Sequence, residues 1–165
     1  MHVSDVADID SWIKWTIVEE VMRNRDGVLF GSDFLYKEDG KFKFGPLWDF
    51  DLSSGGYEGN VPEGWYVNHG NIIGGLFQYH DYYRKRYKEI WNQYHGKITG
   101  ILDYIDEQNA FLERSQKRNH ERWQTIGTET YTGQVLNGSY NSEIQYLKNF
   151  LSKRISWMDA EINKF

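Results

Sequence analysis

Hydrophobic residues recur at helical spacing in four long stretches of the chain. They lie three or four positions apart, the pattern of helices that bury one face, in residues 10–23, 71–94, 97–118 and 140–163. Two shorter runs, 33–37 and 41–45, alternate apolar with polar residues and flank Asp39 and Gly40, a pair typical of a tight hairpin turn. The pattern predicts an α+β fold that is predominantly α-helical, with one small β-hairpin.

The apolar positions also predict which helix faces form the core. The first helix places five of them near helical spacing, at Trp12, Ile13, Ile17, Val21 and Met22. The last helix places five on one face, at Leu147, Phe150, Leu151, Ile155 and Met158. Asp8 or Asp10 is suited to cap the first helix, because a short carboxylate accepts hydrogen bonds from the free N–H groups of the first turn.

Residues 79–91 combine basic and aromatic side chains, which suits either stacking on single-stranded nucleic acid or packing in a core. Tyr83, Tyr87 and Trp91 recur every four residues, which favours a core-facing stripe. The net charge of -5 argues further against attraction to a phosphate backbone. We therefore expect no nucleic-acid partner.

Two segments lack a periodic pattern. Residues 53–70 contain five glycines and Pro62, which predicts a long loop, and residues 127–139 predict a second linker. Aromatic residues make up 17% of the chain, more than a generic core needs. Four of them near the first loop could form a sugar- or peptide-binding platform: Trp48, Tyr57, Trp65 and Tyr66.

The chain contains no cysteine, which excludes disulfides and thiolate metal sites. The first ten residues lack the basic and apolar regions of a signal peptide, and no run of about 18 apolar residues is present to span a bilayer. We expect no membrane insertion by this chain.

Carboxylates occur where predicted rigid elements end. Asp26 follows the first helix, with Asn24 two residues before it, and Asp49 and Asp51 follow the second strand. Oxygen ligands of this kind suit Mg²⁺, Mn²⁺ or Ca²⁺, and Mg²⁺ is commonly held by one or two carboxylates together with substrate phosphates. The pattern favours phosphoryl transfer. The alternative is that the same acids only accept backbone hydrogen bonds in turns.

Three blocks in this order, "NRDG", "GPLWDFDL" and "LKNFLSKRISWMD", give the chain its likeness to a known family. Over most of its length the chain resembles the C-terminal portion of the spore coat protein H (CotH) kinase family. The resemblance implies an atypical protein-kinase-like C-terminal lobe with a small β-hairpin and a helical C-terminal bundle. It also implies ATP-dependent phosphorylation of protein, with Mg²⁺ or another divalent cation, at a cell surface, outside the cell or in a spore coat.

The resemblance also implies roles for individual residues. Asn24 and Asp26 occupy the catalytic loop, with Asp26 as the catalytic base. Asp49 is the first choice of metal ligand and Asp51 the second. Protein kinases place a second metal ligand, an Asn, five residues after the base, where this chain has Gly31 followed by Ser32. Ser32, whose hydroxyl is a weaker ligand, is the candidate there.

The resemblance predicts a single domain that carries one lobe of a kinase. Its parts are a catalytic and metal segment, a glycine-rich loop and a helical region, in residues 1–56, 57–70 and 71–165. The 165 residues contain no glycine-rich strand pair, phosphate-pairing Lys or orienting Glu, so we expect the isolated chain to be inactive. Two alternatives remain, a non-catalytic surface or structural module on the same fold and a hydrolase that uses two of the aspartates on polysaccharide.

Overall fold

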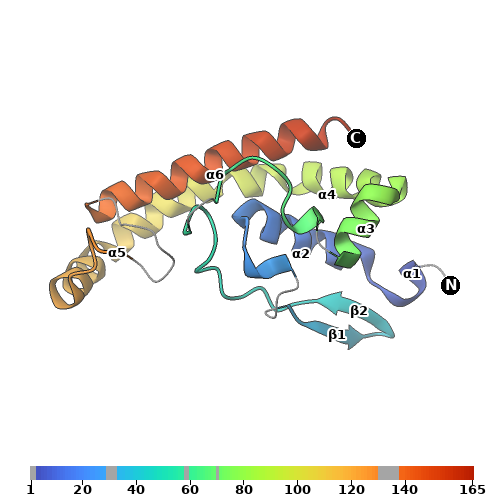
Figure 1. The fold of residues 1–165 in the computed structure, drawn as a ribbon, viewed down its shortest axis with the longest axis horizontal. Coiled ribbons are helices and arrows are strands. Elements are labelled where there is room, and N and C mark those ends of the chain that lie inside the picture. Colours follow the sequence, from blue (N-terminus) through green and yellow to red (C-terminus); the bar gives the residue numbers. More distant parts are fainter. Residues whose placement is uncertain (1–2, 29–32, 58–59, 70, 130–137) are drawn as a thin grey trace.

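The computed structural model describes residues 3–28, 33–57, 60–69, 71–129 and 138–165 (Figure 1). Its elements, in chain order, are α1 (Val3–Val6), α2 (Ile9–Met22), η1 (Asp26–Val28), β1 (Leu35–Glu38), β2 (Lys41–Phe44), η2 (Val67–His69), α3 (Asn71–Tyr79), α4 (Asp81–Thr99), α5 (Ile101–Trp123) and α6 (Tyr140–Ile162). The prediction of a mainly helical α+β fold with one hairpin is confirmed.

Helix α2 lies at the centre of the molecule, with α4 and α6 on one side and the hairpin on the other (Figure 1). Asp8 caps it, because its carboxylate accepts a hydrogen bond from Ser11 N at 3.0 Å. Trp12, Ile13 and Ile17 are at most 5% exposed, as the periodicity predicted. Because α2 is firmly packed, the segment that follows its C-terminal end, which contains Asn24 and Asp26, starts from a fixed position.

The hairpin packs against α2 through the buried ring of Phe44 and a hydrogen bond from Trp12. Asp39 and Gly40 form its turn with φ angles of 50° and 81°, the left-handed conformation that this pair tolerates. Phe44 at the end of β2 is 6% exposed and stacks on Trp15, with ring centroids 4.4 Å apart. Trp12 Nε1 donates to the carbonyl of Phe42 at 2.8 Å. These contacts fix the direction in which the chain leaves β2.

The predicted helix over residues 71–94 is in fact two helices. His80 adopts an extended conformation between α3 and α4. Arg84 stabilises the break, since its guanidinium donates to the carbonyls of Phe77 and Gln78 at 2.7 Å each. The next boundary also differs from the prediction, because α4 continues to Thr99 and α5 begins after Gly100.

Helices α4 and α6 contribute the aromatic part of the core. Tyr83, Tyr87 and Trp91 of α4 are fully buried, which confirms the core interpretation of residues 79–91. In α6, Leu151 and Met158 are at most 1% exposed. Helix α5 has no buried residue, and in Figure 1 its far end projects from the body beside the start of α6.

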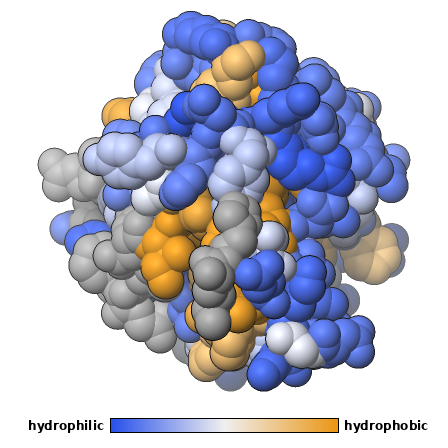
Figure 2. Space-filling model, turned by 90° about the vertical axis from the view of Figure 1, so that its right-hand side faces the viewer, coloured by the Kyte–Doolittle hydropathy of each residue, from blue (hydrophilic) through white to orange (hydrophobic). Residues whose placement is uncertain are grey.

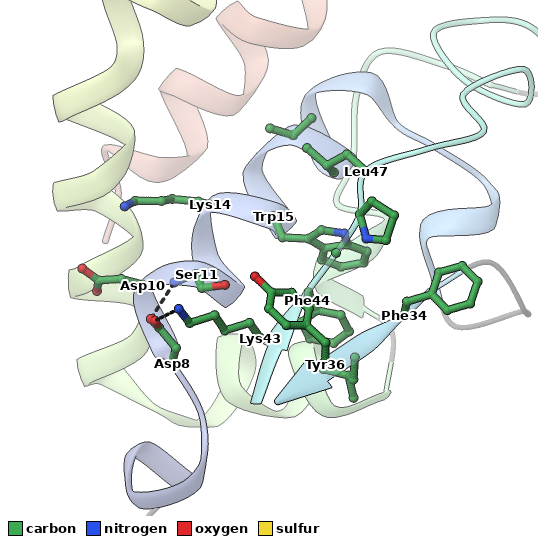
Figure 3. A pocket seen from close by; sticks show the side chains of 14 residues that line it. Asp8, Asp10, Ser11, Lys14, Trp15, Phe34, Tyr36, Lys43, Phe44 and Leu47 are labelled. Atoms are coloured by element: carbon green, nitrogen blue, oxygen red, sulfur yellow. Dashed lines mark hydrogen bonds and ion pairs between the residues drawn. The ribbon is translucent and has the colours of Figure 1, made fainter. Parts of the chain in front are cut away.

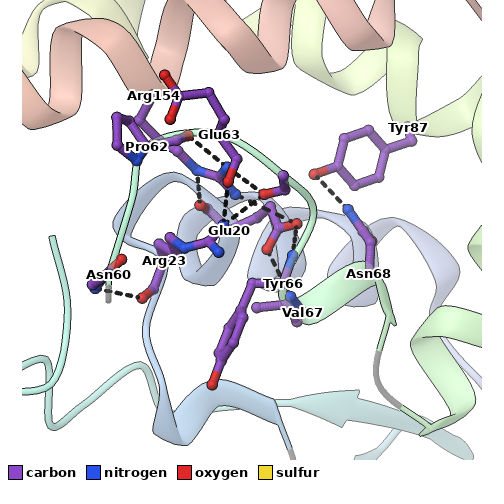
Figure 4. A network of polar contacts seen from close by, with 11 residues as sticks. Glu20, Arg23, Asn60, Pro62, Glu63, Tyr66, Val67, Asn68, Tyr87 and Arg154 are labelled. Atoms are coloured by element: carbon purple, nitrogen blue, oxygen red, sulfur yellow. Dashed lines mark hydrogen bonds and ion pairs between the residues drawn. The ribbon is translucent and has the colours of Figure 1, made fainter. Parts of the chain in front are cut away.

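A buried carboxylate, Glu20 of α2, binds the C-terminal part of the glycine-rich loop (Figure 4). It is fully buried and accepts hydrogen bonds from the backbone N–H groups of Tyr66 and Val67 at 2.8 and 2.7 Å. Arg154 of α6, also fully buried, lies 3.5 Å from the same carboxylate. Burial raises the pKa of Glu20, while the charge of Arg154 and the two amide donors act in the opposite direction.

The Arg154 guanidinium also binds backbone carbonyls from two parts of the chain. It donates to Glu20 O at 2.9 Å, Pro62 O at 2.9 Å and Gly64 O at 2.6 Å. Arg23 adds donations to Glu63 O and Gly64 O at 2.8 and 2.6 Å. Residues 60–67 are therefore held between α2 and α6.

The surface at the end of the molecule that holds both described termini is mainly hydrophilic, with a hydrophobic cluster near the middle of the view (Figure 2). No helix in the described ranges combines the length and the apolar character needed to cross a bilayer.

Candidate functional site

The segment Asn24–Asp26 turns sharply away from the end of α2. Arg23, the C-cap residue of α2, has φ 48°, a left-handed conformation that ends the helix and changes the direction of the chain. Asn24 is 2% exposed, so its amide side chain lies inside the protein. Asp26 is half-buried and begins the short turn η1. The turn thus buries Asn24 and leaves the Asp26 side chain partly accessible.

The segment that follows the hairpin lies directly against this turn. The Asn24 side chain donates to the carbonyl of Asp49 at 3.4 Å. Arg25 N donates to Leu52 O at 3.0 Å, and Ser54 N donates to the Met22 carbonyl at 2.7 Å. These hydrogen bonds join residues that are 25 to 32 positions apart in sequence, and they place the turn that carries Asp26 beside the segment that carries Asp49 and Asp51.

The charges of Asp51 and Asp26 both act on the Asp49 carboxyl. The charge of Asp51 raises the pKa of the exposed Asp49 carboxyl, and burial, a hydrogen bond with Asp51 and the charge of Asp26 act in the same direction. Within the described ranges no lysine, arginine or histidine forms an ion pair with any of the three. The site therefore concentrates negative charge that a cation would neutralise.

The turn-capping interpretation applies to Asp51. Its Oδ1 accepts a hydrogen bond from Leu52 N at 3.0 Å. The Asp51 side chain also hydrogen-bonds with Asp49, and its charge raises the pKa of Asp49. Asp49 itself has φ 61°, a left-handed conformation that Asp tolerates better than most residues. Asp49 is thus exposed to solvent at a residue with left-handed backbone conformation.

The donor set suits a hard divalent cation that brings its own phosphate or water ligands. No group of three His, Cys, Asp or Glu side chains able to hold a metal ion is present in the part of the chain that the structure describes. Mg²⁺ needs only one or two protein carboxylates when phosphates or waters complete the octahedron. Asp49 and Asp51 satisfy that requirement. The other predicted ligand, Ser32, lies outside the described residues.

Sequence reasoning missed a buried acid beneath the site, Glu19. It is 2% exposed and lies next to Glu20 in the apolar run "IVEEVM". Two consecutive acids on a helix that is apolar on most sides are not both expected to face solvent. The pair of acids in this apolar run was therefore a sequence signal that one of them is buried. The pKa of Glu19 is raised to about 7, mainly by burial. A hydrogen bond from Asn24 lowers this pKa, and the charge of Asp33 raises it.

The four aromatic residues near the glycine-rich loop do not share one set of contacts. Trp65 is partly buried and packs edge-on against Phe77 and Trp157, with ring centroids 4.9 and 5.0 Å apart. Trp48 lies against Phe34 at 5.4 Å. Tyr57 and Tyr66 instead hydrogen-bond with each other. Trp65 therefore packs against the core, apart from the other three.

A large open groove of about 1190 Å³ lies between α2 and the hairpin (Figure 3). Trp15, Phe44 and Leu47 form part of its wall, and the Asp8–Lys43 ion pair, with N and O 3.7 Å apart, lies at one end. None of the three aspartates of the candidate site lines the groove. The groove is therefore a neighbour of the carboxylate site and not the site itself.

A family model described as CotH kinase protein matches residues 2–158. No curated protein and no solved structure matches the chain. The family match covers the first turn after α2, the hairpin, the carboxylate segment and most of α6.

Proposed function

The chain belongs to the CotH kinase protein family, and on that premise we propose that it supplies the catalytic base and the metal ligands for phosphoryl transfer from ATP to protein hydroxyls. The observation that carries the proposal is the approach of the turn after α2 to the segment after β2. It gives three carboxylates a common electrostatic environment without a cationic side chain paired to them among the described residues.

Asp26 is the proposed catalytic base. In phosphoryl transfer the base accepts the proton of the attacking hydroxyl, while positioning and charge stabilisation account for most of the rate. The half-buried Asp26 carboxyl is accessible to a substrate hydroxyl, and its backbone N–H donates to Asn24 Oδ1 at 3.3 Å. Asn24 is thus the residue that holds the base in place.

Asp49 is the proposed first metal ligand, with Asp51 as the second. A bound divalent cation would neutralise the charge on the transferred phosphoryl group. The raised pKa of Asp49 reflects repulsion that a cation between the two carboxylates would relieve. Ser32 is the proposed ligand of a second ion.

The remaining kinase parts are proposed to come from another part of the protein. The Lys that pairs with the ATP phosphates in kinases and the Glu that orients this Lys have no counterpart in the sequence of this chain. We propose that the chain acts as the C-terminal lobe of a single domain and is inactive when isolated. We propose that the protein is secreted and acts at a cell surface or in a spore coat, in keeping with family membership.

Transfer of the labelled γ-phosphate of ATP by the protein as encoded in its gene tests this function. We expect incorporation into protein that requires Mg²⁺ or Mn²⁺ and falls by at least about a hundredfold in Asp26→Asn and Asp49→Asn, the scale on which a base contributes. Asp103→Asn, an exposed acid of α5, is the matched control. No metal-dependent transfer by the wild type would favour a non-catalytic surface module, and glycan cleavage would favour the hydrolase.

A further inference from the structure

Two adjacent buried acids of α2 have opposite surroundings. The Glu20 carboxylate is supplied with two backbone N–H donors and faces Arg154. In Glu19, by contrast, Oε2 is buried and has no hydrogen-bond partner among the described residues. A buried acid without a counter-charge is costly and is kept only where something else requires it.

The Glu19 carboxyl points at the turn that carries the candidate base. A Cβ built on Gly27 would lie only 2.4 Å from Glu19 Oε2, so the carboxyl fills the space that a side chain at position 27 would take. Asn24 hydrogen-bonds to the same carboxyl, and Asn24 N donates to the Glu19 carbonyl at 3.0 Å. Glu19 therefore contacts both ends of the segment 24–27.

Asn24 links Glu19 to both of the catalytic segments. Its Oδ1 accepts from Asp26 N at 3.3 Å and its Nδ2 donates to Asp49 O at 3.4 Å. The remaining donor capacity of the amide is directed to Glu19. Fixing the orientation of this one amide fixes the hydrogen bonds to both aspartate segments.

We propose that Glu19 is a positioning residue for Asp26, acting through Asn24 to set the turn on which the base is mounted. This role rests on the proposed function of Asp26. The Glu19 carboxyl accepts from the Asn24 amide, more strongly when it is ionised, and so selects the orientation in which Oδ1 faces Asp26 N. The other charged group whose field reaches Glu19 is Asp33. A group that ionises near neutral pH makes the orientation of Asn24 sensitive to pH in that range.

Solution NMR of the isotopically labelled chain tests the coupling without requiring activity. In the wild type, the Asp26 backbone amide should follow the ionisation of Glu19. In Glu19→Met the Asn24 acceptor is lost, and hydrogen exchange at the Asp26 amide should accelerate by about tenfold, the scale of one lost hydrogen bond. Glu19→Gln keeps the acceptor and should restore protection while abolishing the titration. Glu121→Gln, an exposed acid of α5, is the control.

Unchanged shifts and exchange at Asp26 in both Glu19 variants would overturn the proposal. If Glu19→Met does not fold, the pH response of the Asp26 amide in Glu19→Gln decides, since an unaltered titration contradicts the coupling. In the gene-encoded protein, Glu19→Met should lower kcat at least about tenfold with KM for ATP unchanged, and Glu19→Gln should recover most of it. If Asp26→Asn loses activity while Glu19→Met keeps its full kcat, the positioning role of Glu19 is refuted and the proposed role of Asp26 as the base still stands. Absence of wild-type activity would refute the proposed function, while the NMR result would still decide on the coupling.

Discussion

Replacing Arg154 by methionine removes the only cation within 4.0 Å of the Glu20 carboxylate among the described residues. The guanidinium is fully buried and donates to three carbonyls, of Glu20, Pro62 and Gly64. These three hydrogen bonds would be lost, although the carbonyls of Glu20 and Gly64 would keep donation from Arg23. Methionine keeps much of the apolar volume, so the main effect is a buried carboxylate left without its counter-charge. Breaking such a pair costs about 3–5 kcal/mol. A chain of this size is stabilised by about 5–15 kcal/mol in total, so much of the stability would be lost.

Urea unfolding followed by tryptophan fluorescence measures this change. The indole of Trp157 lies 5.1 Å from the Arg154 guanidinium and reports on the same region. The double variant Glu20→Gln/Arg154→Met should recover at least about 1 kcal/mol relative to Arg154→Met, because the unpaired charge is gone. Arg118→Met, at an exposed position of α5, is the matched control. A loss below about 1 kcal/mol in Arg154→Met would refute the view that this pair stabilises residues 60–67.

Three further changes test local features. The pKa of Glu19 is about 7 in the folded protein and ordinarily 4.5, so its contribution to stability is lost as pH rises from 4.5 through 7. Glu19→Gln should reduce this fall, to which the raised pKa of Glu20 also contributes, and should be up to about 3 kcal/mol more stable at pH 8. Equal pH dependence of urea unfolding in both proteins would contradict it. Gly27→Ala should cost about 1–3 kcal/mol and clearly less in a Glu19→Ala background; an equal cost in both backgrounds would place the carboxyl elsewhere. Asp8→Ala should lose about 1 kcal/mol as an N-cap, measured by thermal unfolding, and an unchanged Tm would mean that Asp8 does not cap α2.

The parts of the fold that depend on local patterns were predictable. The spacing of Trp12, Ile13 and Ile17 and the Asp39-Gly40 turn predict α2 and the hairpin from nearby residues alone. The break at His80 was not predicted, because apolar residues continue at helical spacing across it. The break depends instead on donation from Arg84 to carbonyls of the preceding helix.

Long-range pairs gave no sequence signal. Glu20 and Arg154 are 134 residues apart, and a charged residue on a helix is ordinarily expected to face solvent. Glu19 was also expected to face solvent, although its place beside Glu20 in an apolar run was a local signal of burial. In the candidate site, the positions of Asp26 and Asp49 at the ends of a helix and a hairpin indicated that they could be brought together. The intermediate role of the buried Asn24 amide required the coordinates, because it depends on the left-handed turn at Arg23.

The central proposal is that Asp49 and Asp51 hold a divalent cation beside the candidate base Asp26. Titration of the labelled chain with Mn²⁺, a paramagnetic substitute for Mg²⁺, locates the ion by broadening nearby amide signals. We predict that the amides of residue 26 and residues 49–52 broaden first, and that Asp49→Asn abolishes the effect. Broadening confined to other acidic regions, such as Asp8 and Asp10, and unaffected by that substitution, would contradict the claim.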